Sequence, residues 1–437
     1  MWSIMTYQKF NYETFADVQK QAEAVGVQFH YSDSPAMLAA QARVHHVSVP
    51  NRIVVQPMEG CDANPDGSPG ELTQRRYLRF ANSGAGIIWA EATAVTPDCR
   101  SSNGQLYLTE KNADAYARLL DQIRESAMRT HGFAPLIVSQ LTHSGRYVKT
   151  NNTPTPVIAQ HNAWIEKEHP LPDSCVISDD RLKYYEEQFG KGAALAKKVG
   201  FDGVDIKCAH FYLASELLSA YERSGEYGGC FENRTRFIRN CLRAAKPAAD
   251  QNFFLTSRIN ACDGFPYPWG FGVEKDEGIR EDYTQVNALI GVLKQEAELP
   301  IVNITVGNPY FNPYVNRPYD FGPVEPQEHP FVGVSRMLEA AAAVKQAHPE
   351  LLVVCSGLSY MREFGGRIAA AEIAAGRFDF AGFGRLALAA PDFADKLLHD
   401  TLARRECCVT CTNCSNLMRM FRPAGCIVHD RTLYKKP

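Results

Sequence analysis

The sequence lacks any long hydrophobic run and any excess of charge. No apolar stretch in its 437 residues approaches the roughly 18 residues that a transmembrane helix needs. Its 46 basic residues nearly balance 49 acidic ones, and the resulting formal net charge of −3 argues against binding to nucleic acid or to a membrane surface. Residues 1–6 also lack the charged and then apolar layout of a signal peptide. We therefore expect a cytoplasmic protein with no nucleic-acid or membrane partner.

A further absence concerns the fingerprint G-x-G-x-x-G, which usually follows the first strand of a doubly wound dinucleotide-binding domain. Here the first convincing strand, 52–56, runs directly into Pro57-Met58-Glu59-Gly60-Cys61. No such fingerprint is present at this turn, and this makes a doubly wound open sheet the less favoured architecture.

What the sequence does contain is a regular alternation of strand and helix patterns. Short apolar, β-branched runs indicate buried strands, and each is followed by a segment with helical periodicity. Eight such units over about 350 residues predict an α/β fold of the (β/α)8 barrel type. The predicted strands are 52–56, 86–90, 136–140, 204–206, 253–258, 301–305, 351–355 and 378–382, and the helices that follow them are 73–83, 113–130, 181–199, 233–248, 280–298, 334–348, 362–376 and 393–402.

The pattern divides the chain into three segments. Residues 1–45 are predicted to form an N-terminal extension, in which Thr14 would cap a short helix that stops at Gly26. Residues 46–403 form the barrel, and residues 404–437 form a C-terminal cysteine segment. Three long loops follow strands three, five and six, on the face where barrels carry their active sites, so we expect them to form a substrate roof or the contact of a homo-oligomer: 142–175, 260–278 and 307–331.

The fourth predicted strand ends in a cluster of polar residues. Lys207, His210 and Tyr212 follow the predicted strand 204–206, whose Val204 and Ile206 are apolar and β-branched, and all three can donate a proton or a hydrogen bond to a developing oxyanion. One such residue alone would be interpreted as a solvent-exposed loop side chain. Three of them at the carboxyl end of a barrel strand indicate a catalytic site.

The last two strands indicate a phosphate site. Strand seven ends in Ser356-Gly357, and strand eight ends in a glycine-rich run with Gly384 and Arg385. Glycines let backbone N–H groups approach an anion, and a guanidinium can bind it with two hydrogen bonds. The alternative is that the glycines only permit tight turns.

Two other strand ends carry polar groups that would suit a bound heterocycle. Gln140 ends strand three and Arg258 ends strand five. An isoalloxazine ring needs hydrogen-bonding partners at its pyrimidine edge, and a cation there stabilises the anionic reduced flavin. For each residue taken alone, a surface position is the alternative.

The C-terminal segment holds five of the 13 cysteines. Cys408, Cys411 and Cys414 are spaced C-x2-C-x2-C, and Cys426 follows after eleven more residues. Three close thiolates and one remote thiolate favour an iron–sulfur cluster, whereas structural zinc usually uses two paired knuckles. A structural zinc site with four cysteine ligands remains the alternative, and Cys407 is a spare thiol that could replace Cys408.

Several motifs occur in an order that resembles the old yellow enzyme superfamily, most closely its iron–sulfur branch, which contains 2,4-dienoyl-CoA reductase and trimethylamine dehydrogenase. The resemblance extends from about Val47 to the end of the chain, and its most specific part is Tyr-Gly-Gly-x-x-Glu-Asn-Arg. The motifs lie at 51–58, 84–92, 139–146, 207–212, 226–237 and 382–385.

The resemblance implies an FMN-binding barrel with a [4Fe-4S] cluster bound by Cys408, Cys411, Cys414 and Cys426. Residues of the first three strands would line the flavin or contact its pyrimidine edge, Arg258 would lie near N1 and O2, and residues of the last two strands would hold the phosphate. The cofactor residues implied in this way are Pro57, Met58, Ala92, Gln140, Arg258, Gly357, Gly384 and Arg385.

The resemblance also implies catalytic roles. Tyr212 stands where related reductases keep the tyrosine that protonates the substrate α-carbon, and His210 stands at the second position of the pair that binds the substrate carbonyl oxygen. The first position is usually His and here is Lys207, whose ammonium could anchor a carboxylate or polarise a carbonyl. Glu59 replaces a residue that is often Thr or Cys near the flavin, and it could pair with Lys207.

The leading hypothesis is an FMN- and [4Fe-4S]-dependent oxidoreductase that reduces an activated C=C bond of a small-molecule substrate. Because the chain ends at Pro437, we expect it to take electrons from NAD(P)H or to exchange them through the cluster with a separate electron-transfer protein. An amine-type dehydrogenase is the second hypothesis. More remote ones are a Schiff-base aldolase that uses Lys207 with a zinc tail, and a non-catalytic electron-transfer module.

Overall fold

A computed structural model describes residues 9–276 and 278–435. At its centre is a closed barrel in which eight strands pair in parallel, and the first strand pairs with the last. The predicted (β/α)8 barrel is confirmed. The strands are β3 (Ile53–Val55), β4 (Ile87–Ala94), β5 (Leu136–Thr142), β8 (Gly203–Ile206), β9 (Phe254–Asn260), β10 (Ile301–Thr305), β11 (Leu352–Cys355) and β12 (Phe380–Phe383).

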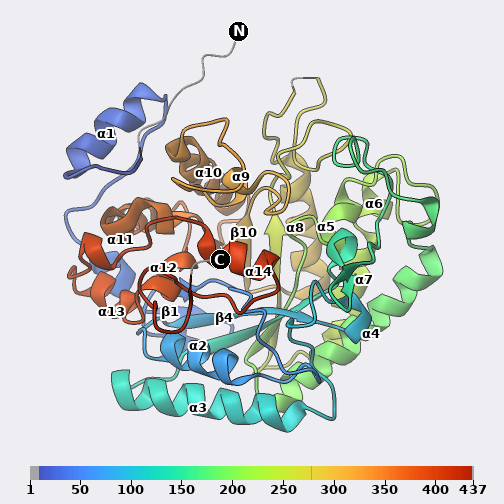
Figure 1. Ribbon diagram of the computed structural model, residues 1–437, viewed down its shortest axis with the longest axis horizontal. Coiled ribbons are helices and arrows are strands. Elements are labelled where there is room, and N and C mark those ends of the chain that lie inside the picture. Colours follow the sequence, from blue (N-terminus) through green and yellow to red (C-terminus); the bar gives the residue numbers. More distant parts are fainter. Residues whose placement is uncertain (1–8, 277, 436–437) are drawn as a thin grey trace.

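A ring of helices surrounds the barrel, with α3 along one edge and α4 along the next (Figure 1). Helix periodicity in the sequence places apolar side chains on the face that packs against the strands, as with Leu120 and Ile123 of α3. The main helices after the strands are α2 (Glu71–Ala81), α3 (Ala113–His131), α4 (Asp179–Val199), α7 (Arg236–Ala245), α8 (Thr284–Ala297), α10 (Pro330–Ala347), α11 (Gly365–Ala374) and α13 (Phe393–Leu398).

A β-hairpin closes the N-terminal end of the barrel. Its strands, β1 (Ala42–Val44) and β2 (Val47–Val49), pair in antiparallel fashion, and Val44 and Val49 belong to the same buried cluster as barrel residues such as Trp89. The hairpin therefore plugs one end and leaves the other end for a ligand. It spans residue 45, where the sequence analysis placed a boundary, and the division of the chain into three segments stays a prediction.

The N-terminal helix α1 (Phe15–Ala24) begins as the sequence predicted. Thr14 caps it, and its hydroxyl and the Asp17 carboxylate form a reciprocal capping box. The ring of Phe15 lies 6.2 Å from that of Phe364, so this extension packs on the α11 side of the barrel. Residues 1–8 of the predicted extension lie outside the described residues.

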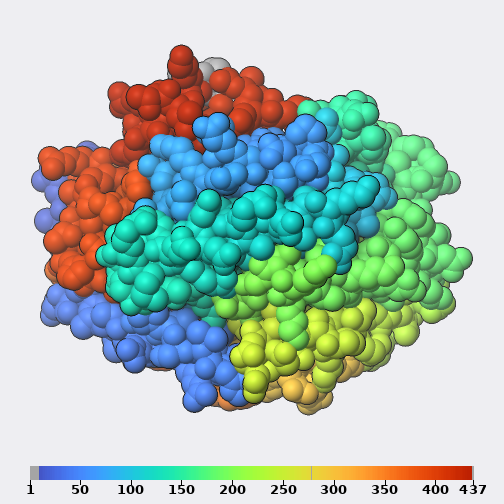
Figure 2. Space-filling model, turned by 90° about the horizontal axis from the view of Figure 1, so that it is seen from below, coloured from blue at the N-terminus to red at the C-terminus, as the bar shows by residue number. Residues whose placement is uncertain are grey.

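The cysteine segment lies over the carboxyl ends of the barrel strands, with α14 (Asn413–Arg419) in front of the barrel (Figure 1) and the segment raised at one end of the molecule (Figure 2). The Ala424 N–H donates to the Gly60 carbonyl at 2.7 Å, and the Arg419 guanidinium donates to the Pro309 carbonyl at 2.9 Å. These bonds tie the segment to the loops after β3 and β10. The segment therefore covers the same end of the barrel that carries the predicted site.

Short elements occur in the loops at the same end: β6 (Lys149–Thr150), β7 (Thr153–Pro154), α5 (Leu213–Leu218), α6 (Phe231–Arg234), α9 (Pro313–Asn316) and α12 (Arg385–Ala389). None of the helices in the described ranges is long and apolar enough to cross a membrane. The expected homo-oligomer stays a prediction.

Candidate functional site

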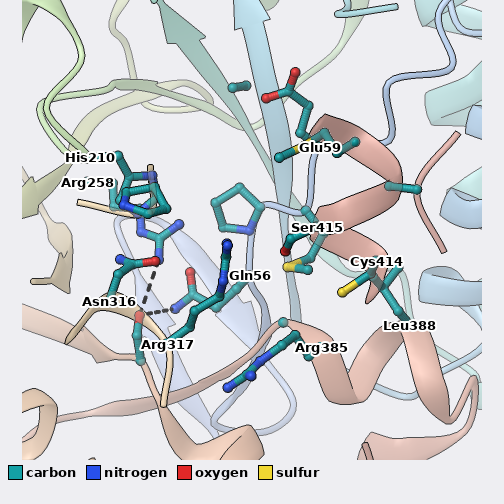
Figure 3. Close-up of a pocket in the computed structure, with 18 of the residues that line it drawn as sticks. Gln56, Glu59, His210, Arg258, Asn316, Arg317, Arg385, Leu388, Cys414 and Ser415 are labelled. Carbon is teal, nitrogen blue, oxygen red and sulfur yellow. Dashed lines mark hydrogen bonds between the residues drawn. The ribbon is translucent and has the colours of Figure 1, made fainter. Parts of the chain in front are cut away.

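A cavity of about 1130 Å³, with the open space at its mouth included, lies at the carboxyl ends of the strands, under the cysteine segment (Figure 3). Every residue that the sequence analysis assigned to catalysis or to cofactor binding lines this cavity. Their roles stay predictions, but the structure brings them all together: Pro57, Met58, Ala92, Gln140, Lys207, His210, Tyr212, Arg258, Gly357, Gly384 and Arg385.

Several buried donors in the cavity wall have no hydrogen-bond partner within the described chain. They are Nε2 of His210, Nε of Arg258 and one terminal nitrogen of Arg385. A buried unpaired donor is costly, about 1–3 kcal/mol and more for a charged group. The wall is therefore suited to a ligand that brings acceptors to these positions, such as a phosphate and the carbonyl groups of a heterocycle.

The glycines of the predicted phosphate site are required by close packing. A Cβ at Gly384 would lie 2.6 Å from the Met58 sulfur, and Gly357 has a φ of +94°, which favours glycine. These facts agree with the tight-turn interpretation. What points to an anion is Arg385, because one of its terminal nitrogens donates to the Pro318 carbonyl at 2.7 Å while the other is left without a partner in the described residues.

An unusual turn places His210 and Tyr212 on the cavity wall. His210 and Phe211 have φ values of 67° and 59°, so two consecutive non-glycine residues are left-handed. Such backbone strain persists only where surrounding contacts hold it, and it is frequent at functional sites. The Asn260 side chain accepts from the His210 N–H at 3.2 Å, and Tyr212 then caps the buried helix α5.

Lys207 is almost fully buried, and its Nζ lies 3.7 Å from the centroid of the Tyr212 ring. Burial lowers the pKa of Lys207 to about 7, although the nearby Glu59 carboxylate opposes the shift. Burial likewise keeps the pKa of His210 well below its usual value, so this imidazole is neutral. At neutral pH the pair therefore offers one partly protonated amine and one neutral ring.

The pairing suggested for Glu59 differs from the one in the structure. Among the described residues Glu59 makes no ion pair with Lys207; its Oε1 accepts from the Ser101 hydroxyl at 2.7 Å. Burial raises the pKa of the Glu59 carboxyl, and Lys207 acts on it only through its charge.

Sequence reasoning missed two tyrosines that face Tyr212. The hydroxyl groups of Tyr212 and Tyr310 lie 2.7 Å apart, and the Tyr310 ring stacks on that of Tyr147 with centroids 3.8 Å apart. Tyr310 lies in the loop after β10, one of the loops expected to form a substrate roof. The aromatic content of that loop was the signal, but it did not indicate which ring would reach Tyr212.

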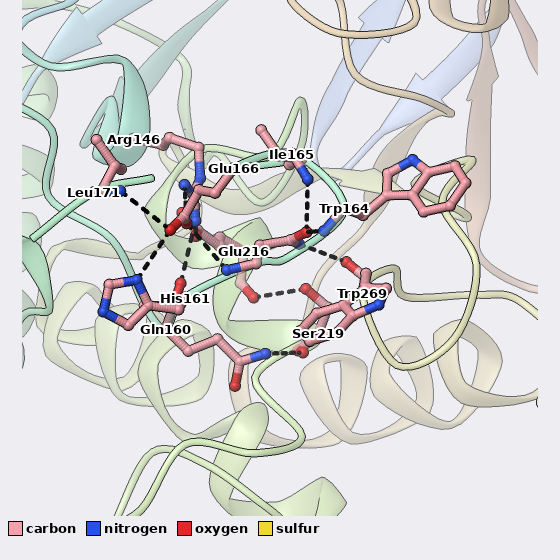
Figure 4. A network of polar contacts seen from close by, with 12 residues as sticks. Arg146, Gln160, His161, Trp164, Ile165, Glu166, Leu171, Glu216, Ser219 and Trp269 are labelled. Carbon is pink, nitrogen blue, oxygen red and sulfur yellow. Dashed lines mark hydrogen bonds and ion pairs between the residues drawn. The ribbon is translucent and has the colours of Figure 1, made fainter. Parts of the chain in front are cut away.

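A buried ion network holds the roof in place (Figure 4). The Arg146 guanidinium donates to a Glu166 oxygen at 2.6 Å and to a Glu216 oxygen at 2.5 Å. Glu216 belongs to α5, the helix that Tyr212 caps, and Arg146 precedes Tyr147. The network thus links the loop after β5 to the turn that carries the predicted proton donor.

The four predicted metal-binding cysteines line a second, smaller cavity, whose empty space is about 330 Å³ with the open space at its mouth included. Cys407 is not part of this lining, and its thiol instead contacts the Ala403 carbonyl, which favours Cys408 as the fourth ligand. Backbone N–H groups of Thr410 and His429 donate to the sulfurs of Cys408 and Cys426 at 3.4 Å. Such bonds to sulfur are typical of thiolates that hold an iron–sulfur cluster.

No three Cys, His, Asp or Glu side chains in the described residues converge as a site for a metal ion. The cluster, and the choice between it and a structural zinc ion, stay predictions. Arg385, Leu388 and Cys414 line both cavities, so the two share a wall.

Comparisons with known proteins find related sequences and similar folds. The family model described as "NADH:flavin oxidoreductase / NADH oxidase family" matches residues 38–298, from just before the hairpin to just past the end of α8. Curated relatives include NADPH dehydrogenases of Bacillus pumilus (32% identical over 223 residues, 50% of this chain and 61% of that protein) and Bacillus licheniformis (34% over 224 residues, 50% and 61%). The chain thus matches less than two thirds of their length.

Similar solved structures include a 2-naphthoyl-CoA reductase in complex with 2-naphthoyl-CoA (TM-score 0.72, 19% identity, 91% of this chain and 57% of that one). Histamine dehydrogenase of Rhizobium sp. 4-9 has a TM-score of 0.68 at 17% identity, over 90% of this chain and 52% of that one. Morphinone reductase has a TM-score of 0.61 at 21% identity, over 83% and 90%. At these identities the likeness establishes the fold.

Proposed function

Because the chain belongs to the NADH:flavin oxidoreductase / NADH oxidase family, we propose that it is an oxidoreductase that binds FMN in the cavity at the carboxyl end of its barrel. The observation that carries the proposal is the convergence of all eight predicted cofactor residues on one cavity, with unpartnered nitrogens on Arg258 and Arg385. FMN, when bound, supplies hydride chemistry between NAD(P)H and a substrate. The relatives named NADPH dehydrogenases support NAD(P)H as the reductant.

The protein's part is to hold the cofactor and the substrate. Arg385, with the backbone beside Gly357 and Gly384, would bind the phosphate, and Arg258 and Gln140 would bind the pyrimidine edge. Pro57, Met58 and Ala92 supply apolar contact on the same wall. The cysteine segment, which covers this end of the barrel, keeps water from the reacting atoms.

We propose reduction of an activated C=C bond as the reaction. The protonated Lys207 amine and Nε2 of His210 would bind the carbonyl oxygen of the substrate, where negative charge develops. The Tyr212 hydroxyl would give its proton to the α-carbon, and the Tyr310 hydroxyl, 2.7 Å away, is placed to return a proton to it. The neighbours named as reductases of morphinone and of 2-naphthoyl-CoA support this reaction class.

We also propose a [4Fe-4S] cluster bound by Cys408, Cys411, Cys414 and Cys426. The shared wall supports a second candidate function, because Cys414 reaches both cavities and would bring the cluster next to the flavin. In that function the barrel would oxidise an amine-type substrate, as the name of histamine dehydrogenase suggests, and pass electrons to a separate carrier protein. Membership of a flavin family makes the Schiff-base aldolase hypothesis for Lys207 less favoured.

Anaerobic half-reactions separate the two functions. NADPH and a panel of amines are tested as reductants of the protein, and 2-cyclohexenone and a one-electron dye are tested as oxidants of the reduced protein. C=C reduction predicts that NADPH and cyclohexenone form the active pair and that Tyr212→Phe slows only the oxidative half. If amines reduce the protein, NADPH does not, and only the dye reoxidises it, the dehydrogenase function replaces the first proposal.

A further inference from the structure

A buried carboxylate beneath the cavity joins three strands. Asp205 of β8 is fully buried and does not line the cavity. Its Oδ2 accepts from the Trp89 indole N–H at 2.8 Å and from the Gln140 amide at 2.6 Å, and its Oδ1 accepts from the Arg258 backbone N–H at 2.7 Å. Two of its three partners are therefore the residues predicted to bind the flavin pyrimidine edge.

These contacts decide which way the Gln140 amide points. An ionised carboxylate has only acceptor oxygens, so the Gln140 NH2 group must face Asp205. Gln140 and Arg258 both line the cavity, so the Gln140 carbonyl oxygen is the atom of this amide left for a ligand there, and the Nε of Arg258 has no partner in the described chain. The wall thus presents an acceptor beside a cationic donor, which complements an imide edge, where an N–H group adjoins a carbonyl.

We propose that Asp205 is a positioning residue for the cofactor: it fixes the Gln140 amide as an acceptor for the flavin N3–H and places a negative charge beneath Arg258. The inference rests on the proposed function, since it names the residue that orders the FMN site. Burial raises the pKa of the Asp205 carboxyl, and the three donated hydrogen bonds oppose that rise and favour the ionised form.

The substitution Asp205→Asn tests the orientation without changing the shape of the side chain. An Asn has one acceptor oxygen, so it cannot accept from the Arg258 backbone N–H at one atom and from the Trp89 indole N–H and the Gln140 amide at the other. With its oxygen toward the Arg258 N–H, its NH2 group faces Gln140, whose amide rotates to accept from it, and the Trp89 N–H loses its acceptor. The rotated Gln140 amide presents its NH2 group to the flavin N3–H. Two hydrogen-bond donors then face each other, and we expect FMN to bind at least tenfold more weakly.

The same substitution changes the charge near the flavin. Removing the carboxylate leaves the Arg258 cation less compensated, and a cation near the pyrimidine edge stabilises the anionic reduced flavin. We therefore expect the flavin midpoint potential of Asp205→Asn to rise. A purely structural loss would lower FMN affinity or thermal stability without moving the potential in this direction.

The experiment compares wild type, Asp205→Asn and the control Asp202→Asn, each stripped of flavin and titrated with FMN. Asp202 precedes the same strand and also accepts a strand N–H, that of Ile137 at 2.7 Å, but neither Ile137 nor its other partner Arg124 lines the cavity. We expect the control to bind FMN within twofold of wild type and to keep its potential. Gln140→Ala is added to complete a double-mutant cycle. In this cycle the losses of FMN-binding free energy caused by the two substitutions should be much less than additive.

A measurement on wild type covers the case in which Asp205→Asn fails to fold. With ¹⁵N-labelled FMN, the N3 resonance should report an N–H that donates a hydrogen bond. An N3–H without a bonded acceptor overturns the inference, as do additive losses in the cycle or an unchanged potential in Asp205→Asn. If wild type itself binds no FMN, the proposed function is refuted. If wild type binds FMN but the results above contradict the role of Asp205, only this inference is refuted.

Discussion

Replacing Arg146 with Met should destabilise the protein far more than the loss of a surface ion pair. The Arg146 side chain is buried and contacts Glu216, which is 1% exposed, and Glu166 (Figure 4). Removing one partner of a buried pair leaves an uncompensated charge, at a cost of about 3–5 kcal/mol. With an unfolding entropy of about 2.1 cal/mol/K per residue, a chain of this length should lose about 3–5 °C in Tm.

The assay is differential scanning calorimetry at one scan rate, with Lys183→Met as the control. Lys183 forms an exposed pair with Glu226 (47% and 56% exposed), which solvent screens, so its loss should lower Tm by no more than about 1 °C. The effect of Arg146→Met should shrink at lower pH, because a protonated Glu216 needs no cation. Equal Tm values for the two variants would refute the reasoning.

Three further predictions concern the cofactor sites. Arg385→Gln should weaken FMN binding by about 10- to 150-fold in a fluorescence titration, because a hydrogen bond to a charged group contributes about 1.5–3 kcal/mol. The control is Arg422→Gln, at an exposed position, which should bind FMN within twofold of wild type. The amine of Lys207 loses its proton as pH rises through about 7, so the flavin absorption band should shift between pH 6 and 8, and Lys207→Met should abolish the shift. Cys414→Ser should lose protein-bound iron in a chelation assay, whereas Cys407→Ser should keep it.

Each of these predictions has a contradicting result. Equal FMN affinity of Arg385→Gln and wild type would remove the phosphate assignment. A spectral shift that persists in Lys207→Met would assign the titration to another group. Iron loss in Cys407→Ser with full retention in Cys414→Ser would reverse the choice of ligands.

Most of the barrel could be predicted from sequence because its strands are buried on both faces. Strands such as β8 and β11 therefore stand out as short β-branched runs, and the helices between them keep their amphipathic period. The closing hairpin was not predicted. Its turn uses His45 at a φ of 53° and lacks the Asn-Gly or Asp-Gly pair that marks most tight hairpins.

The candidate site was predictable where it depends on topology. Residues at the carboxyl ends of parallel strands meet at one end of a barrel, so Gln140, Arg258 and Arg385 converge although they are far apart in sequence. Contacts from irregular loops were not predictable, because loop residues have no period. Tyr310 is one example, and Glu59, which bonds to Ser101, is another. The role of Asp205 was hidden because the residue lies inside a strand.

The central claim is that this barrel holds FMN beside an iron–sulfur cluster. The most direct measurement is an anaerobic visible spectrum of the purified protein, with flavin and iron quantified before and after addition of dithionite. The account predicts flavin bands over a broad iron–sulfur absorbance that bleaches on reduction, with FMN and iron in a ratio of about one to four. A colourless protein that contains zinc would contradict it.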